Sequence, residues 1–113
     1  MRTTKKAKIL RLHFGESDRY QGKPLYEEIV LLAKKFPMAG ATVVKGVMGF
    51  GCKSHMHTAK ILRLSEDLPM IIEIVDSEEK ISRFLPQLDK MVGDGLITLE
   101  KANVVMYRAS GKI

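Results

Sequence analysis

The sequence has one cysteine, Cys52, no tryptophan, and few other aromatic residues, which make up 6% of its 113 residues. A single cysteine cannot form an intrachain disulfide, so the fold must depend on a packed core, as in proteins of a reducing compartment. No apolar run approaches the eighteen residues that a membrane-spanning helix needs. The basic N-terminus lacks the apolar stretch of a signal peptide, because Arg11 and His13 interrupt Ile9–Phe14. We therefore expect a cytoplasmic protein without membrane insertion.

The sequence also lacks the motifs of the common enzyme classes. It contains no Walker motif, no nucleophile elbow and no zinc-hydrolase motif. Glu66 and Asp67 are adjacent, so in an extended segment their carboxylates point apart and form a poor acid/base pair. The RNP signature of RNA-recognition domains is absent, and the strand expected at Met70–Val75 has no aromatic residue to stack on a base. These absences predict a protein that is not an enzyme and does not bind nucleic acid.

The composition of the chain is that of one globular domain covering residues 1–113. It is 45% hydrophobic and 28% charged, which is enough apolar material for a core. Nineteen Lys and Arg residues against thirteen Asp and Glu residues give a formal net charge of +6. This excess favours anionic partners such as nucleotides or phosphorylated metabolites.

Hydrophobic periodicity predicts the order β-α-β-β-α-β, which is that of a ferredoxin-like α+β sandwich. The expected strands are Lys8–Phe14, Thr42–Met48, Met70–Val75 and a last one from Leu96 to Leu99, interrupted at Glu100–Asn103 before an extended segment, Val104–Tyr107. One expected helix covers Pro24–Phe36. The other begins at Asp76, which forms a capping-box pattern with Glu79, and has Gly93 as its C-cap.

A long connection joins the two central strands. About twenty residues separate the glycines at Gly49-Phe50-Gly51 from the strand that begins at Met70, far more than a hairpin needs. Connections of this length in compact domains are usually functional, although Ile61, Leu62 and Leu64 could instead be packed as an extra strand.

The expected strands are apolar on both faces. Ile72 and Ile74 alternate with Ile71 and Val75, but two helices can cover only one face of a four-stranded sheet. The other face must be buried against something, and we expect further copies of the same chain in a closed homo-oligomer.

Two groups of residues are candidates for ligand chemistry. Gly49-Phe50-Gly51 and Gly93-Asp94-Gly95 are either simple turns or places where backbone N–H groups approach an anion. The cationic residues that could assist are Lys45, Lys53, Arg108 and Lys112. Cys52, His55 and His57 could instead bind zinc or copper, which predicts the alternative function of a metal- or ion-responsive trimer of related fold. Without a metal, His57 could form a hydrogen bond within the loop or contact the ligand.

Four segments between Lys45 and Thr98 resemble a known family: KGVMGFG, HMH, LSEDLPMIIEIVD and GDGLIT. They are similar to the PII-like family of small proteins of unknown function, related to the nitrogen-regulatory PII signal-transduction proteins. The resemblance extends from Lys8 to Tyr107. It implies a ferredoxin-like fold, a homotrimer with its sheets packed inward, and a regulatory, ligand-binding role without catalytic activity.

PII proteins bind ATP or ADP in clefts between subunits, so the resemblance implies an adenine nucleotide. The matching positions are Val44-Lys45-Gly46, Gly49-Phe50-Gly51, Gly93-Asp94-Gly95 and Val104–Arg108. The resemblance implies that the glycine segments contact the ligand by backbone and that Lys53 and Arg108 supply charge. Binding would then order Cys52–Leu64, which would present a changed surface to a protein partner. This chain departs from the PII pattern at three places: Met106 replaces one of two arginines, Cys52-Lys53 replaces Arg-Gln, and Leu96 replaces a lysine.

Overall fold

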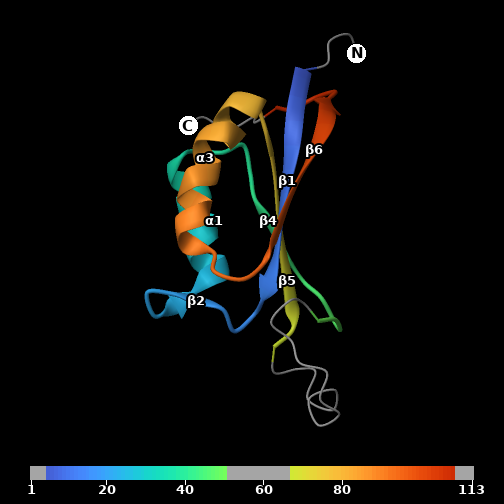
Figure 1. The fold of residues 1–113 in the computed structure, drawn as a ribbon. Helices are drawn as coiled ribbons and strands as arrows, with labels where there is room; N and C mark the ends of the chain where they lie inside the picture. Colours follow the sequence, from blue (N-terminus) through green and yellow to red (C-terminus); the bar gives the residue numbers. More distant parts are fainter. Residues whose placement is uncertain (1–4, 51–66, 109–113) are drawn as a thin grey trace.

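A four-stranded antiparallel sheet forms the centre of the fold (Figure 1). The computed structural model describes residues 5–50 and 67–108. In the sheet, the long strand β1 lies between β5 and β6, and β5 also pairs with the short edge strand β4. The bounds of these strands are β1 Lys5–Gly15, β4 Thr42–Lys45, β5 Pro69–Asp76 and β6 Leu96–Val104. The order β4-β5-β1-β6 confirms the ferredoxin-like arrangement.

Both helices lie on the same side of this sheet (Figure 1). They are α1, Leu25–Lys35, and α3, Glu78–Met91. A small hairpin that the sequence did not predict, made of β2 (Arg19–Tyr20) and β3 (Lys23–Pro24), lies between β1 and α1. Neither helix in the described ranges is long and apolar enough to span a membrane.

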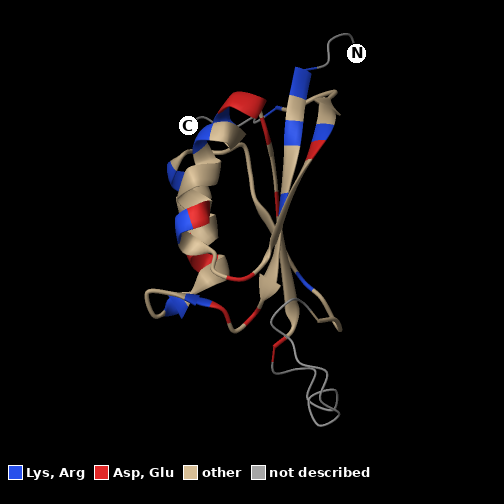
Figure 2. Ribbon diagram, in the orientation of Figure 1, with Lys and Arg blue, Asp and Glu red and all other residues tan. Residues whose placement is uncertain are grey.

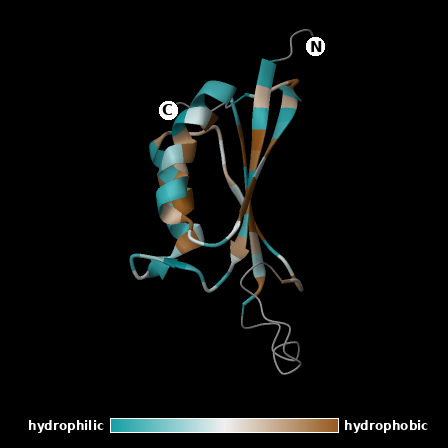
Figure 3. Cartoon of the chain, in the orientation of Figure 1, coloured by the Kyte–Doolittle hydropathy of each residue, from teal (hydrophilic) through white to brown (hydrophobic). Residues whose placement is uncertain are grey.

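The core lies between the helices and one face of the sheet, where apolar residues gather (Figure 3). Alternate residues of β1 and β5 point into it, so that Leu10 pairs with Ile74 and Leu12 with Ile72. Phe84 of α3 is fully buried and its ring meets that of Phe36 edge-on, with the ring centroids 4.9 Å apart. The buried apolar residues of α1 and α3 therefore form this core with the sheet.

The predicted caps of α3 are wrong. Ser77, not Asp76, is the N-cap, and its side chain accepts a hydrogen bond from the Lys80 N–H at 3.2 Å. Asp76 remains the last residue of β5 because it pairs with Lys8 of β1. At the other end the C-cap is Val92, in an extended conformation, so the helix needs no left-handed glycine at Gly93.

Two predicted strand boundaries are also corrected. Strand β6 continues through Glu100–Asn103 because it pairs with β1 along its whole length, and the polar side chains lie at an exposed edge. Strand β4 ends at Lys45, which pairs with Met70. The ladder stops there because the next residue of β5 is Pro69, which has no N–H to donate. Val47 and Met48 therefore lie beyond the sheet and are exposed.

Replacing Phe84 with alanine should destabilise the fold strongly. The ring is 0% exposed, so its removal leaves a cavity, and such substitutions cost about 3–5 kcal/mol. Leu31→Ala on the outer side of α1, where the side chain is 59% exposed, is the control and should change the stability little. Thermal and urea denaturation of both variants measures the difference; equal stability would contradict this placement of the core.

Candidate functional site

The face of the sheet that the helices leave uncovered carries both apolar and charged side chains. Val44 and Leu96 are about half exposed there, and Ile9, Ile71 and Val75 are partly buried by their neighbours. At the centre, Arg11 donates hydrogen bonds to Glu73 at 2.9 Å and to Glu100 at 2.6 Å. These bonds, to Glu100 first and then to Glu73, raise the pKa of Arg11 above its ordinary value. The predicted second apolar face is thus confirmed, with an ion-paired trio in its middle that the sequence did not predict.

The glycine segments lie at one end of the sheet, which we call the glycine end and define as Gly46–Phe50 after β4 and Gly93–Gly95 before β6 (Figure 1). Gly95 packs against β1, where an added Cβ would lie 2.9 Å from the carbonyl oxygen of His13. Gly49 has a φ of +154° and packs against the ring of Pro69, so a side chain there would be strained and crowded. Glycine is therefore a packing requirement at these two positions.

The two segments of the glycine end leave from opposite edges of the sheet. Strands β4 and β6 are separated by β5 and β1, and three strand spacings of about 4.8 Å make roughly 14 Å. Phe50 and Asp94 are both exposed at this end. The backbone of Gly46 is already bonded, since its N–H donates to the Pro69 carbonyl at 2.7 Å.

Lys45, the cationic residue at this end, is paired within its own chain. Its ammonium group donates a hydrogen bond to the carboxylate of Glu16 at 2.9 Å. This bond, and the attraction between the two charges, raise the pKa of Lys45 above its ordinary value. An anionic ligand that uses Lys45 must therefore compete with Glu16, a residue that the sequence did not single out.

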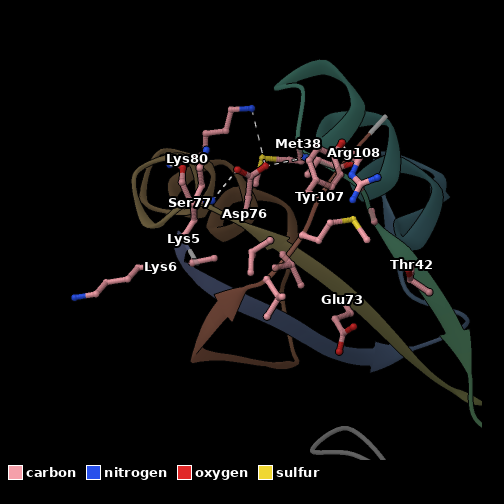
Figure 4. Close-up of a pocket in the computed structure, with 18 of the residues that line it drawn as sticks. Lys5, Lys6, Met38, Thr42, Glu73, Asp76, Ser77, Lys80, Tyr107 and Arg108 are labelled. Carbon is pink, nitrogen blue, oxygen red and sulfur yellow. Dashed lines mark hydrogen bonds and ion pairs between the residues drawn. The ribbon is translucent and has the colours of Figure 1, made fainter. Parts of the chain in front are cut away.

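A cavity of about 1070 Å³ lies at the other end of the sheet (Figure 4). Its volume is at the upper limit of ordinary ligand sites. We call it the C-terminal cavity; its walls are the start of β1, the loop between α1 and β4, the end of β5, the start of α3, and the segment after β6: Lys5–Ala7, Pro37–Thr42, Glu73, Val75–Ser77, Lys80 and Val104–Arg108. The side chains of Tyr107 and Arg108 lie beside Met38, while Lys6 points away from them (Figure 4).

The C-terminal cavity has more basic than acidic groups around it. Lysines cluster at the first residues of β1 (Figure 2), and Lys80 and Arg108 line the cavity from two other directions. Glu73 and Asp76 are the carboxylates in the lining. This charge suits a small anion, and the methionine and tyrosine side chains of the lining offer apolar surface to an attached ring.

The structure separates the candidate residues into two groups. Lys45, Gly49, Phe50 and Gly93-Asp94-Gly95 lie at the glycine end, and Arg108 lines the C-terminal cavity. Strand β6 connects the two ends, and its eight residue steps from Leu96 to Val104, at about 3.3 Å each, span roughly 26 Å. One chain therefore cannot bring Arg108 and the glycine segments to the same small ligand.

Several predicted residues lie outside the described residues: Gly51, Lys53, the metal candidates Cys52, His55 and His57, and the cationic candidate Lys112. Within residues 5–50 and 67–108 there is no group of three or more His, Cys, Asp or Glu side chains that could hold a metal ion.

The walls of the C-terminal cavity were largely missed by sequence reasoning. The small residues Ala39-Gly40-Ala41, between α1 and β4, were not singled out from the sequence. Asp76 was interpreted as a helix cap, although its carboxylate reaches back to this loop and accepts a hydrogen bond from the Ala39 N–H at 2.8 Å. Short small-residue segments before a strand are the signal that could have indicated a ligand wall.

Comparison with sequence families and curated proteins gives one family and several relatives of similar length. Residues 7–104 match the model of the DUF190 family, which is described as an uncharacterized ACR. A UPF0166 protein of Aquifex aeolicus is 40% identical over 105 residues, which cover 93% of this chain and 98% of that relative. A UPF0166 protein of Methanocaldococcus jannaschii is 41% identical over 100 residues, which cover 88% and 92%.

Among solved structures, PII-like proteins have folds similar to that of this chain. CPII of Thiomonas intermedia, solved with ADP, AMP and acetate, matches with a TM-score of 0.59 and 18% identity, over 92% of this chain and 93% of that one. A PII-like signalling protein of Thermus thermophilus matches with a TM-score of 0.61 and 17% identity, over 90% and 92%. At such low identity these matches establish the shared fold.

Substitutions at the two glycines that flank Asp94 should differ sharply in effect. Gly95→Ala places a methyl group against the backbone of β1, which cannot move easily, and should lower the free energy of unfolding by about 1–3 kcal/mol. Gly93→Ala, where an added Cβ meets nothing within 4 Å, is the matched control and should be nearly neutral. Denaturation curves of the two variants test this; a neutral Gly95→Ala would show that Gly95 does not pack as described.

Proposed function

The chain belongs to the DUF190 family, and from this premise we propose that it is a PII-like regulatory protein that binds an adenine nucleotide between subunits. The glycine end of one copy and the C-terminal cavity of the next form the two sides of each site. The assembly is a homotrimer, and the protein acts by binding and not by catalysis.

The separation of the candidate residues supports this proposal most directly. The glycine segments and Arg108 lie roughly 26 Å apart along β6, so a site that uses both needs two copies of the chain. A closed ring of identical subunits brings unlike ends together at every interface, since such contacts are heterologous. The uncovered face of the sheet supplies the apolar surface for this assembly.

The choice of ligand rests on the lining and on the neighbours in structure. CPII of Thiomonas intermedia has been solved with ADP and bicarbonate and with ADP and AMP. In this chain, Lys5 and Arg108 supply positive charge for phosphate at the C-terminal cavity. Arg108 stands where PII proteins carry the second of their two arginines, and Met106 stands at the other position. With fewer cations than a PII site, a nucleotide with one or two phosphates fits this lining better than a triphosphate does.

Residues 51–66, which lie outside the described residues, would transmit the regulatory signal by contacting a protein partner. Described residues on either side of that segment are held near the glycine end: Lys45 bonds to Glu16, and the Asp67 carboxylate accepts a hydrogen bond from the Ser17 N–H at 3.0 Å. A ligand that takes Lys45 from Glu16 would thus act at the base of the segment and change what it presents to a protein partner.

Arg108→Gln should weaken nucleotide binding by at least about tenfold, because a hydrogen bond to a charged group contributes about 1.5–3 kcal/mol. Isothermal titration with ADP and with AMP measures the loss, and the matched control is Arg83→Gln, an exposed arginine on α3 that is not in the cavity lining. Wild-type protein that releases no heat and shows no thermal shift with either nucleotide would refute the proposed ligand.

Ile71→Glu should dissociate the assembly, because it places a carboxylate on the face that neighbouring copies would bury. Light scattering should then report a change from about 38 kDa, three chains of 12.7 kDa, to a single chain. Leu31→Glu, on the exposed side of α1, should leave the trimer intact. A wild-type protein that stays monomeric at micromolar concentration contradicts the trimer.

A further inference from the structure

Ala39 lies in the wall of the C-terminal cavity. Its backbone N–H and its carbonyl each form a hydrogen bond with a side chain from a distant part of the chain. Its N–H donates to the Asp76 carboxylate at 2.8 Å, and its carbonyl accepts a hydrogen bond from the Tyr107 hydroxyl at 3.3 Å. Asp76 and Tyr107 approach the loop from different elements, the end of β5 and the segment after β6. Ala39 therefore links these two parts of the cavity wall.

The Asp76 side of this link is firmly fixed. The side chain is 11% exposed, and its second oxygen accepts a hydrogen bond from the Ser77 N–H at 2.7 Å, at the N-terminus of α3. Lys80, one turn into the helix, lies 3.9 Å from the same carboxylate and donates a hydrogen bond to the carbonyl of Pro37 at 2.5 Å. The loop is thus attached to the start of α3 through Pro37 and to the end of β5 through Ala39.

The Tyr107 side carries the segment that holds Arg108. Val105–Arg108 lies beyond β6 without regular structure, and the side chains of Val105, Met106 and Tyr107 are all more than half exposed. Within residues 5–50 and 67–108, the Tyr107 hydroxyl is the side-chain group of this segment that hydrogen-bonds another element. A segment with so little buried surface moves easily unless such a contact holds it.

We propose that Asp76 and Tyr107 are positioning residues: through Ala39, they fix Arg108 at the wall of the C-terminal cavity. Neither side chain needs to touch the ligand. Asp76 holds the Ala39 peptide, the peptide holds the Tyr107 hydroxyl, and the hydroxyl places the next residue, Arg108, before any ligand arrives. This inference rests on the proposed function, in which Arg108 contacts the nucleotide.

A double-mutant cycle between Tyr107 and Arg108 tests the proposal by titration with ADP. Tyr107→Phe removes one hydroxyl and should weaken ADP binding by about 3- to 10-fold, the effect of one hydrogen bond. In the Arg108→Gln background the same change should have no further effect, because Tyr107 acts through Arg108. Tyr20→Phe, in the small hairpin far from the cavity, is the control and should leave binding unchanged. Equal losses in both backgrounds would overturn the proposal, since Tyr107 would then act independently of Arg108.

A second measurement needs no ligand and therefore separates this inference from the proposed function. Trypsin cleaves after Arg108, and mass spectrometry follows that cut. Tyr107→Phe should raise its rate several-fold without changing the melting temperature, because the segment is released while the core is intact. Asp76→Asn should raise it too, and the double variant should be no faster than the faster single one. An unchanged rate in Tyr107→Phe overturns the positioning role; a faster rate in a protein that binds neither ADP nor AMP retains it and refutes the ligand instead.

Discussion

Strand β1 pairs with a neighbour on both sides, and this double pairing fixes the positions of the glycine segments and of Arg108. Its residues pair with β5 on one side and with β6 on the other, from Lys8 to His13 on both sides at once. The register fixes the ends at which the connections lie: both glycine segments are at the end of the sheet where β1 ends, on its two opposite edges, and the segment with Arg108 is at the end where β1 begins. Because the strands are stiff and extended, no loop movement within one chain can bridge that distance.

The face of the sheet that the helices leave uncovered is the surface on which further copies of the chain are proposed to pack. The helix-covered face buries the core, while the uncovered face keeps Val44, Leu96 and Ile71 around the trio of Arg11, Glu73 and Glu100. The apolar rim favours association, and an ion-paired trio buried by a partner favours one relative orientation over others, because misplacing it would leave charges unpaired. In the proposed function, assembly and the ligand site would therefore both follow from one arrangement of strands.

Much of this fold could be predicted from the sequence, since alternation in Leu10-Leu12-Phe14 and Ile72-Ile74 and the stripes of both helices are local patterns. The errors were at positions that tertiary contacts decide. Glu100–Asn103 has a polar sequence yet continues a strand because β1 pairs with it, and Asp76 remains in β5 for the same reason. The candidate site residues stay a prediction. Glycines and arginines are visible in a sequence, but the bonds from Asp76 and Tyr107 to Ala39 join residues 37 to 68 positions apart and leave no local pattern.

If two copies of the chain complete each ligand site, as proposed, mixing of variant subunits should restore binding. Lys45→Gln and Arg108→Gln damage opposite sides of the proposed site, so trimers of either variant alone should bind ADP poorly. After the two variants are unfolded and refolded together in equal amounts, about one quarter of the sites should combine an intact glycine end with an intact C-terminal cavity and bind ADP with wild-type affinity. No recovery of wild-type sites in mixed trimers would contradict the account, because it would mean that each site lies within a single chain.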